Sequence, residues 1–336
     1  MKIHYLIIGM MIGMLSSCAQ QKEKEVTKEP EGKEICFADP TVIRKNGKYY
    51  LTGTGENNPQ GFTMLESEDL KSWHVMSGDS VQYILKQGAQ TYGDTGFWAP
   101  QWFEDNGRCY FTYTANEQTA LAEADTWCGP FVQNVVRPID GSEKNIDSFL
   151  FKDDDGKYYL YHVRFNHGNY IWVGEFDMQE GKIKPGTLHQ CLTVTEDWEN
   201  TSNYISDPIM EGPTVIKLDG VYYLFYSANH FMNIDYAVGY ATSSSPLGPW
   251  KKYKGNPIIS RVLVKENGSG HGDVFTDNSG KYYYVYHVHA SDTTVTPRRT
   301  RIVPLKMQKD ESGIYDISIM ADSIIKPCVN NSSFAS

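Results

Sequence analysis

A hairpin signal that occurs five times constrains the fold of this 336-residue chain more than any other feature. In each copy, a turn dipeptide ending in glycine stands beside β-branched and aromatic residues, a pattern that predicts two strands joined by a tight turn. The turn glycines are 49 to 64 residues apart, so each unit has room for about four short strands, the content of a propeller blade. The copies occupy residues 46–51, 106–111, 155–160, 219–224 and 279–284. We therefore predict an all-β repeat protein and favour a β-propeller.

A second regularity lies eight or nine residues before each turn glycine, where one polar or aromatic residue opens the strand that leads into the turn. In a propeller the first strand of each blade lines the central channel, so residues at one offset form a ring at one mouth. The five positions hold Asp39, Trp98, Asp147, Glu211 and His271. Three members of this predicted ring are carboxylic acids.

Carboxylic acids that face one another across a narrow pocket can hydrolyse a glycosidic bond. One carboxyl group protonates the leaving oxygen, and the other activates water or attacks the sugar. Inverting enzymes hold the pair about 6.5 to 9.5 Å apart and retaining enzymes about 5 Å apart. Opposite sides of a propeller mouth favour the wider separation, so we predict inversion. A single Asp before Pro, as at Asp39, is ordinarily a turn or cap residue, but three acids at the repeat offset favour function.

The N-terminus carries the signals of export. Lys2 precedes an apolar run over residues 5–15, which is shorter than the roughly 20 residues that span a bilayer and fits a signal peptide. The following Leu15-Ser16-Ser17-Cys18 resembles a bacterial lipobox, with ordinary signal cleavage as the alternative. We predict a signal peptide over residues 1–17 and a lipidated Cys18 with a flexible tether over residues 18–33. The expected location is the bacterial outer membrane or periplasm, with the protein anchored through Cys18.

The rest of the chain is predicted to form one domain. Residues 34–326 contain no charged or Pro-rich linker, so we predict a single catalytic domain there and a C-terminal tail over residues 327–336. The 31 basic and 41 acidic side chains give a net charge of −10, which makes nucleic acid a poor partner and leaves carbohydrate open. Apart from Cys18, five cysteines remain without a Cys-x-x-Cys pair, so neither a disulfide framework nor a zinc site is indicated. We expect a monomer that contacts the membrane only through its anchor.

Five short motifs, in order over residues 36 to about 325, resemble the blade motifs of glycoside hydrolase family 43. They are Ala38-Asp39-Pro40, Phe97-Trp98-Ala99-Pro100, Asn145-Ile146-Asp147-Ser148, Glu211-Gly212-Pro213 and Gly270-His271-Gly272-Asp273-Val274. The resemblance implies a five-bladed β-propeller and an inverting mechanism. It implies Asp39 as general base, Glu211 as general acid and Asp147 as the residue that orients substrate and modulates the acid. Because a free Glu titrates near 4.3, a general acid needs a raised pKa, which a charged Asp147 nearby would supply.

Four further residues are candidates for substrate binding. Trp98 fits an apolar wall for the sugar or a packing residue, and Phe37, next to the base, fits a subsite or the core equally. Arg298 lies in a segment that resembles a final-blade strand whose first arginine reaches the active site. His271 lies in the fifth motif, where family relatives place a histidine near a calcium ion or ordered water. We expect no required cofactor and keep a structural calcium at His271 as an alternative.

The resemblance leaves the sugar open, because family relatives act mainly on arabinofuranosides, xylosides and arabinans, and some on galactofuranosides. Long loops over residues 53–61, 85–96 and 196–210 would border the mouth and close it to a pocket, which favours release of single terminal sugars. We predict an exo-acting α-L-arabinofuranosidase that releases terminal pentose from plant-type polysaccharide or oligosaccharide. The alternative is a β-xylosidase or β-galactofuranosidase.

Many xylosidases of the family carry a carbohydrate-binding β-sandwich after the propeller. No such domain is expected after residue 326, which counts modestly against the xylosidase alternative. A non-catalytic glycan-binding propeller is an alternative of a different class. Such a protein would have no reason to keep both Asp39 and Glu211, so we favour the enzyme.

Overall fold

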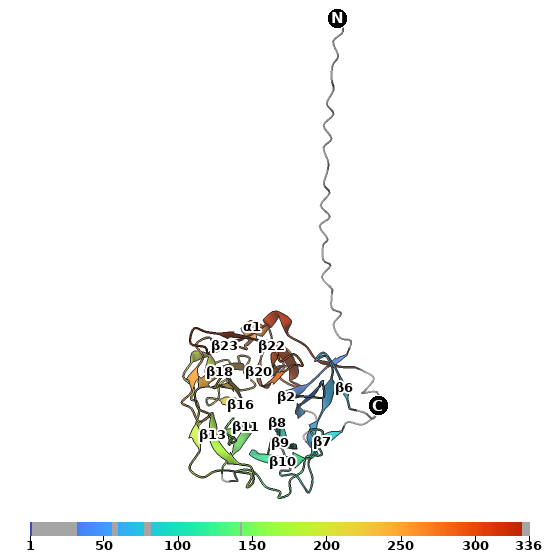
Figure 1. The fold of residues 1–336 in the computed structure, drawn as a ribbon, viewed down its shortest axis with the longest axis vertical. Coiled ribbons are helices and arrows are strands. Elements are labelled where there is room, and N and C mark those ends of the chain that lie inside the picture. The colour runs from blue at the N-terminus through green and yellow to red at the C-terminus, as the bar shows by residue number, and fades with distance from the viewer. Residues whose placement is uncertain (2–31, 56–59, 77–81, 142, 331–336) are drawn as a thin grey trace. The chain divides into compact units, whose positions relative to one another are not determined.

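The computed structural model describes residues 32–55, 60–76, 82–141 and 143–330, in addition to Met1. Apart from Met1, the predicted signal peptide lies outside these residues, as do Cys18 and nearly all of the predicted tether. Five sheets are arranged as blades around a central axis, and the first long strand of each blade lies nearest the centre (Figure 1). Within the described residues, no helix has the length and apolar character needed to cross a membrane. The predicted all-β, five-bladed β-propeller is confirmed.

Each blade is built outward from its inner strand, which pairs antiparallel with the strand that follows it in the chain. The inner strands are β2 (Phe37–Lys45), β8 (Trp98–Asp105), β11 (Asn145–Lys152), β16 (Met210–Leu218) and β20 (Gly270–Thr276). Their hairpin partners are β3 (Lys48–Gly55), β9 (Arg108–Ala115), β12 (Tyr158–Phe165), β17 (Val221–Ala228) and β21 (Tyr282–Val288).

The outer strands differ in number between blades. They are β5 (Leu65–Ser67) and β6 (Ser72–Val75) in blade 1, β10 (Gln118–Ala124) in blade 2, β13 (Asn169–Asp177), β14 (Lys182–Ile183) and β15 (His189–Gln190) in blade 3, β18 (Ala237–Ser243) and β19 (Lys251–Lys252) in blade 4, and β22 (Arg299–Lys309) and β23 (Tyr315–Ile319) in blade 5. Strands β4 (Gly61–Thr63) and β7 (Tyr83–Lys86) form a separate pair, and the short helices are α1 (Arg261–Val264) and two 3-10 turns, Asp197–Glu199 and Ala321–Ser323.

The turns of the repeated hairpins are of two lengths. Blades 1, 2 and 4 have two-residue turns in which both residues have positive φ, for example Asn46 at 52° and Gly47 at 81°. This geometry explains the Asn-Gly and Asp-Gly dipeptides. Blades 3 and 5 instead have five-residue turns, since Lys152 pairs with Tyr158 and Thr276 pairs with Tyr282. The longer turns of blades 3 and 5 change the number of residues between the turn glycine and the residue that lines the channel.

The hydrophobic core formed by the described residues consists of five clusters, one between each pair of neighbouring blades. Tyr161 of blade 3 and Leu224 of blade 4 share one cluster, and Phe225 of blade 4 and Tyr284 of blade 5 share the next. The other three clusters lie between blades 1 and 2, 2 and 3, and 5 and 1. Cys109, which takes a tyrosine position in its repeat, is buried in one of them. The alternating aromatic residues of the hairpins therefore hold the blades together.

Both ends of the described domain lie in the sheet of blade 1. Strand β1 (Lys33–Glu34) pairs antiparallel with β24 (Cys328–Val329), and β24 pairs in parallel with β6. The boundaries predicted at residues 34 and 326 therefore cut through this sheet, and the first residues of the predicted tail belong to the propeller. Strands of only two residues carry too little periodicity to be recognised in a sequence.

Candidate active site

Each inner strand is interrupted by a β-bulge, and this bulge places the predicted site residues. The ladder to the second strand shifts register at the same place in all five blades. One residue of every bulge has a positive φ: Asp39 (46°), Ala99 (49°), Asp147 (54°), Gly212 (60°) and His271 (39°). Bulges re-aim side chains at the end of a sheet, so these residues surround the channel at one mouth.

The ring in the structure differs from the predicted ring at two positions. Ala99 and Gly212, rather than Trp98 and Glu211, are equivalent to Asp39. The longer turns of blades 3 and 5 cause this difference, because they add one residue between the bulge and the turn glycine. Glu211 therefore comes one residue before the bulge position of its strand, and its carboxyl group reaches the site from there.

A closed series of five hydrogen bonds, which we call the bulge ring, connects the blades at this mouth. The backbone N–H of each bulge residue donates to a side chain of the preceding blade. The pairs are Asp39 to His287 Nδ1 (3.1 Å), Ala99 to Thr54 Oγ1 (2.9 Å), Asp147 to Thr114 Oγ1 (3.1 Å), Gly212 to Asp147 Oδ2 (3.2 Å) and His271 to Ser227 Oγ (2.8 Å). Since buried amides need partners, the bulge ring fixes the blades, and with them the carboxylates, relative to one another.

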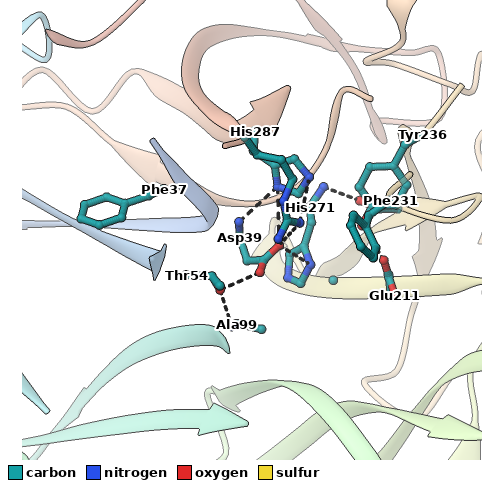
Figure 2. Close-up of polar contacts among 12 residues, drawn as sticks. Phe37, Asp39, Thr54, Ala99, Glu211, Phe231, Tyr236, His271 and His287 are labelled. Carbon is teal, nitrogen blue, oxygen red and sulfur yellow. Dashed lines mark hydrogen bonds and ion pairs between the residues drawn. The ribbon is translucent and has the colours of Figure 1, made fainter. Parts of the chain in front are cut away.

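Asp39 is the most strongly paired of the three acids (Figure 2). Its Oδ2 accepts a hydrogen bond from Thr54 Oγ1 at 2.6 Å, and its Oδ1 lies 3.3 Å from His271 Nδ1 and 3.4 Å from Arg298 Nη1. Burial raises the pKa of Asp39. The charge of Arg298, followed by the interactions with His271, His287 and Thr54, lowers that pKa to well below its ordinary value. Asp39 is therefore a charged carboxylate near neutral pH.

The histidine at the back of this site is neutral. His287 has no exposed side-chain surface, and burial, followed by the charge of Arg298, lowers its pKa well below the ordinary value. Because its Nδ1 accepts the Asp39 amide, the single ring proton is on Nε2. The 3.5 Å approach of Arg298 Nη1 to that nitrogen is then not a hydrogen bond. Arg298 also packs over the ring of Phe231, with its Cζ 4.8 Å from the ring centroid.

Asp147 lies between Asp39 and the acid of blade 4. Its Oδ2 accepts the Gly212 N–H and is 3.7 Å from His271 Nδ1, so His271 contacts both aspartates. Burial, followed by the negative charges of Glu211 and Asp39, raises the pKa of Asp147 well above its ordinary value. Two buried carboxyl groups that repel each other do not both ionise readily, so Asp147 and Glu211 retain a proton to higher pH than free acids do.

Glu211 has the properties of a general acid. Its Oε1 accepts a hydrogen bond from Tyr236 Oη at 2.8 Å, and the Asn169 side chain also bonds to it. Burial raises the pKa of Glu211 to about 7; the charge of Asp39 acts in the same direction, and the Tyr236 hydrogen bond opposes it. A charged Asp39 and a protonated Glu211 at the same mouth are the two protonation states that a pair of carboxyl groups needs to hydrolyse a glycosidic bond.

The donor set around His271 does not fit a calcium site built from protein ligands. Calcium takes six to eight oxygen ligands, whereas the described residues contain no group of three or more His, Cys, Asp or Glu side chains placed to hold a metal ion. The Nδ1 of His271 is already directed at two carboxylates. A calcium ion at His271 would need oxygen ligands other than these side chains, so it stays a prediction, and no chemical step here depends on it.

The other three predicted binding residues lie in different surroundings. Arg298 contacts Asp39, as described. Trp98 is half-buried and packs against the cluster between blades 3 and 4, with its ring so close to Gly96 that an added Cβ there would lie 2.0 Å from it. Phe37 packs against the cluster between blades 5 and 1, and its ring points away from Asp39 (Figure 2). The position of Phe37 fits the packing alternative.

Several residues that contact the acids were absent from the prediction. Four of these residues lie seven residues after a turn glycine, an offset at which the sequence repeats a side chain able to accept a hydrogen bond: Thr54, Thr114, Ser227 and His287. Asn169 and Tyr236 follow no repeat offset, because they come from the start of β13 and the segment before β18. They reach Glu211 only through tertiary structure.

Known proteins provide an independent comparison. The sequence model described as glycosyl hydrolases family 43 matches residues 34–312. The chain is 24% identical to a protein named beta-D-galactofuranosidase xynD from Aspergillus niger, over 86% of this chain and 84% of that protein. It is 28% identical to a putative beta-xylosidase from Escherichia coli, over 80% of this chain but only 49% of that protein.

Solved structures give the same result. A Bacteroides thetaiotaomicron structure titled as an endo-1,4-beta-xylanase has a TM-score of 0.80 and 39% identity, over 89% of this chain and 99% of that one. A thermostable family-43 glycoside hydrolase has a TM-score of 0.74 and 31% identity, over 88% of this chain and 96% of that one. Together with the five blades and the buried carboxylates at one mouth, these matches show that the chain belongs to glycosyl hydrolases family 43 and is a glycoside hydrolase.

Proposed function

We propose that this glycoside hydrolase acts with inversion and releases a terminal pentose, with α-L-arabinofuranose as the first candidate. The observation that carries the acid and base roles is the opposite protonation of two acids at one mouth, and inversion is what the resemblance to the family implies for such a pair. The pKa of Asp39 lies well below its ordinary value, whereas the pKa of Glu211 is raised to about 7. Each group is thus ready for a different proton transfer.

In the proposed reaction, Glu211 donates its proton to the glycosidic oxygen as the bond from that oxygen to the anomeric carbon breaks. Asp39 accepts a proton from a water molecule that attacks the anomeric carbon from the opposite face, which inverts the configuration. Asp147 orients the sugar beside Glu211. Because its own pKa is raised by burial and by the charges of Glu211 and Asp39, the pair resists taking up two negative charges. Arg298 and His271 keep Asp39 charged and in place.

A second candidate sugar is β-D-xylose. The solved structure with 39% identity is titled as an endo-1,4-beta-xylanase, and the Escherichia coli relative is named a putative beta-xylosidase. Galactofuranose is the third candidate, from the name of the Aspergillus niger relative. A panel of nitrophenyl α-L-arabinofuranoside, β-D-xyloside and β-D-galactofuranoside separates these, and turnover of only the third would contradict pentose release.

The variant Glu211→Gln separates an enzyme from a glycan-binding protein. Loss of the general acid should lower turnover of an oligosaccharide by about 10²- to 10⁴-fold, while calorimetric binding of the sugar persists. Glu117→Gln, which changes a glutamate of an exposed ion pair with Lys144, is the matched control and should keep wild-type turnover. Unchanged turnover in Glu211→Gln would refute the proposed acid.

We also propose that Cys18 carries a lipid that anchors the protein in the bacterial outer membrane or periplasm. The support is the sequence Leu15-Ser16-Ser17-Cys18 after an apolar run. Cys18→Ala should abolish labelling by a fatty-acid analogue and move the protein from the membrane fraction to the soluble fraction. Continued labelling of that variant would contradict the proposal.

A further inference from the structure

The bulge ring contains one exception, at blade 4. In the other four blades the acceptor of the bulge amide belongs to the second strand of the preceding blade: His287, Thr54, Thr114 and Ser227. For the Gly212 amide the acceptor is the carboxylate of Asp147, which is itself a bulge residue on an inner strand. The same mouth therefore uses two kinds of acceptor.

Val163 explains the exception. The four regular acceptors pair in the ladder with the residue that precedes the bulge, as Thr54 pairs with Ala38 and Ser227 pairs with Glu211. In blade 3 the equivalent residue, paired with Ile146, is Val163. Valine has no side-chain acceptor, and Val163 is fully buried in the cluster between blades 3 and 4.

The amide of Gly212 cannot remain without a partner at this position. Gly212 is buried, and an unpaired buried N–H would bear the full cost of its desolvation. The Gly212 amide donates to Asp147 Oδ2, at 3.2 Å. This bond holds the Asp147 carboxylate against the backbone amide that directly follows Glu211. It thereby sets the distance between Asp147 and Glu211.

We propose that Val163 is a positioning residue: by offering no acceptor, it directs the Gly212 N–H to Asp147 and thereby fixes that carboxylate beside Glu211. The inference rests on the proposed roles of Asp147 and Glu211 in hydrolysis. Val163 acts only through Asp147, since it has no group that could bind sugar or transfer a proton.

The variant Val163→Thr tests this directly, because threonine is close in shape to valine and has the hydroxyl found at Thr54 and Thr114. The hydroxyl would accept the Gly212 N–H and release Asp147. We expect kcat to fall about tenfold, the order of magnitude of one hydrogen bond to a charged group, and KM to change less than kcat. Val173→Thr is the matched control, since Val173 is equally buried in the same cluster but lies on β13; it should keep the wild-type kcat.

Val163→Ala separates positioning from packing. Alanine leaves a larger void than threonine but adds no acceptor, so it should lower thermal stability and yet reduce kcat less than Val163→Thr does. A packing role predicts the reverse order for kcat. If Val163→Thr fails to fold, Val163→Ser supplies the same acceptor with less bulk.

A readout independent of activity is the amide signal of Gly212 in ¹⁵N-glycine-labelled protein. Asp147→Asn should shift this signal in the wild-type background but leave it nearly unchanged in the Val163→Thr background. Equal shifts in both backgrounds, or equal kcat for Val163→Thr and Val173→Thr, would overturn the inference. If Glu211→Gln instead keeps its turnover, the proposed function fails, whatever the Gly212 signal shows.

Discussion

Removal of the Tyr236 hydroxyl should move the alkaline limb of the pH profile upward. Tyr236 is fully buried, and burial, followed by the charge of Glu211, raises the pKa of Tyr236 well above its ordinary value, so it remains a donor at neutral pH. Its hydrogen bond at 2.8 Å stabilises charged Glu211 and so opposes the burial that raises the pKa of Glu211 to about 7. In Tyr236→Phe this opposition is lost, and the pKa of Glu211 rises.

The size of the shift follows from the difference between two hydrogen bonds. A bond to a charged group contributes about 1.5–3 kcal/mol and a bond to the neutral acid about 0.5–1.5 kcal/mol. The difference of about 1 kcal/mol corresponds to somewhat less than one pKa unit. Since Glu211 acts in its protonated form, activity in the variant should persist to a pH higher by about that amount.

The assay is the pH dependence of kcat/KM on an oligosaccharide or alkyl glycoside, because a nitrophenolate leaves without a proton. Tyr226→Phe is the matched control, since it removes a tyrosine hydrogen bond of 2.7 Å to Glu199, a buried glutamate outside the site. The control should have the same alkaline limb of kcat/KM as the wild type. An alkaline limb in Tyr236→Phe that stays at the wild-type pH, or moves to lower pH, would refute Glu211 as the acid.

Two further predictions concern stability. Gly212→Ala would place a Cβ 2.8 Å from the His271 ring on a residue with φ of +60°, and should cost about 1–3 kcal/mol in urea unfolding; unchanged stability would contradict the strained bulge. Glu266→Gln removes the carboxylate that bonds fully buried Arg301 at 2.7 and 2.9 Å but leaves the Glu34 carboxylate, 3.2 Å from Arg301 Nη2, and should cost about 1.5–3 kcal/mol. Glu117→Gln, from an exposed pair, should cost less than about 1 kcal/mol, so equal losses would refute the role of the buried pair.

The blades could be predicted from the sequence because their signals are local. A turn such as Asn46-Gly47 needs positive φ at both residues, and the tyrosines beside it fill the space between neighbouring blades. The order of the site residues around the mouth followed from the same repeat. These features depend on residues close together in the chain, so a single sequence reveals them.

The exact offset of Glu211 could not be predicted in this way. Counting back from a turn glycine assumes turns of equal length, whereas blades 3 and 5 have five-residue turns. The hydrogen bonds of Asn169 and Tyr236 to Glu211 depend on segments far apart in sequence. The strand pairing of β1 with β24, in which Glu34 lies opposite Cys328, likewise joins the two ends of the domain.

The most direct test of the central claim is ¹H NMR of the first sugar anomer that the enzyme releases. With Asp39 activating water and Glu211 protonating the leaving oxygen, an α-L-arabinofuranoside must give β-arabinose first, and a β-xyloside must give α-xylose. Mutarotation then equilibrates either product. First release of the anomer with the configuration of the substrate would contradict the account, because it would require a covalent intermediate on a carboxylate and remove Asp39 from its role as base.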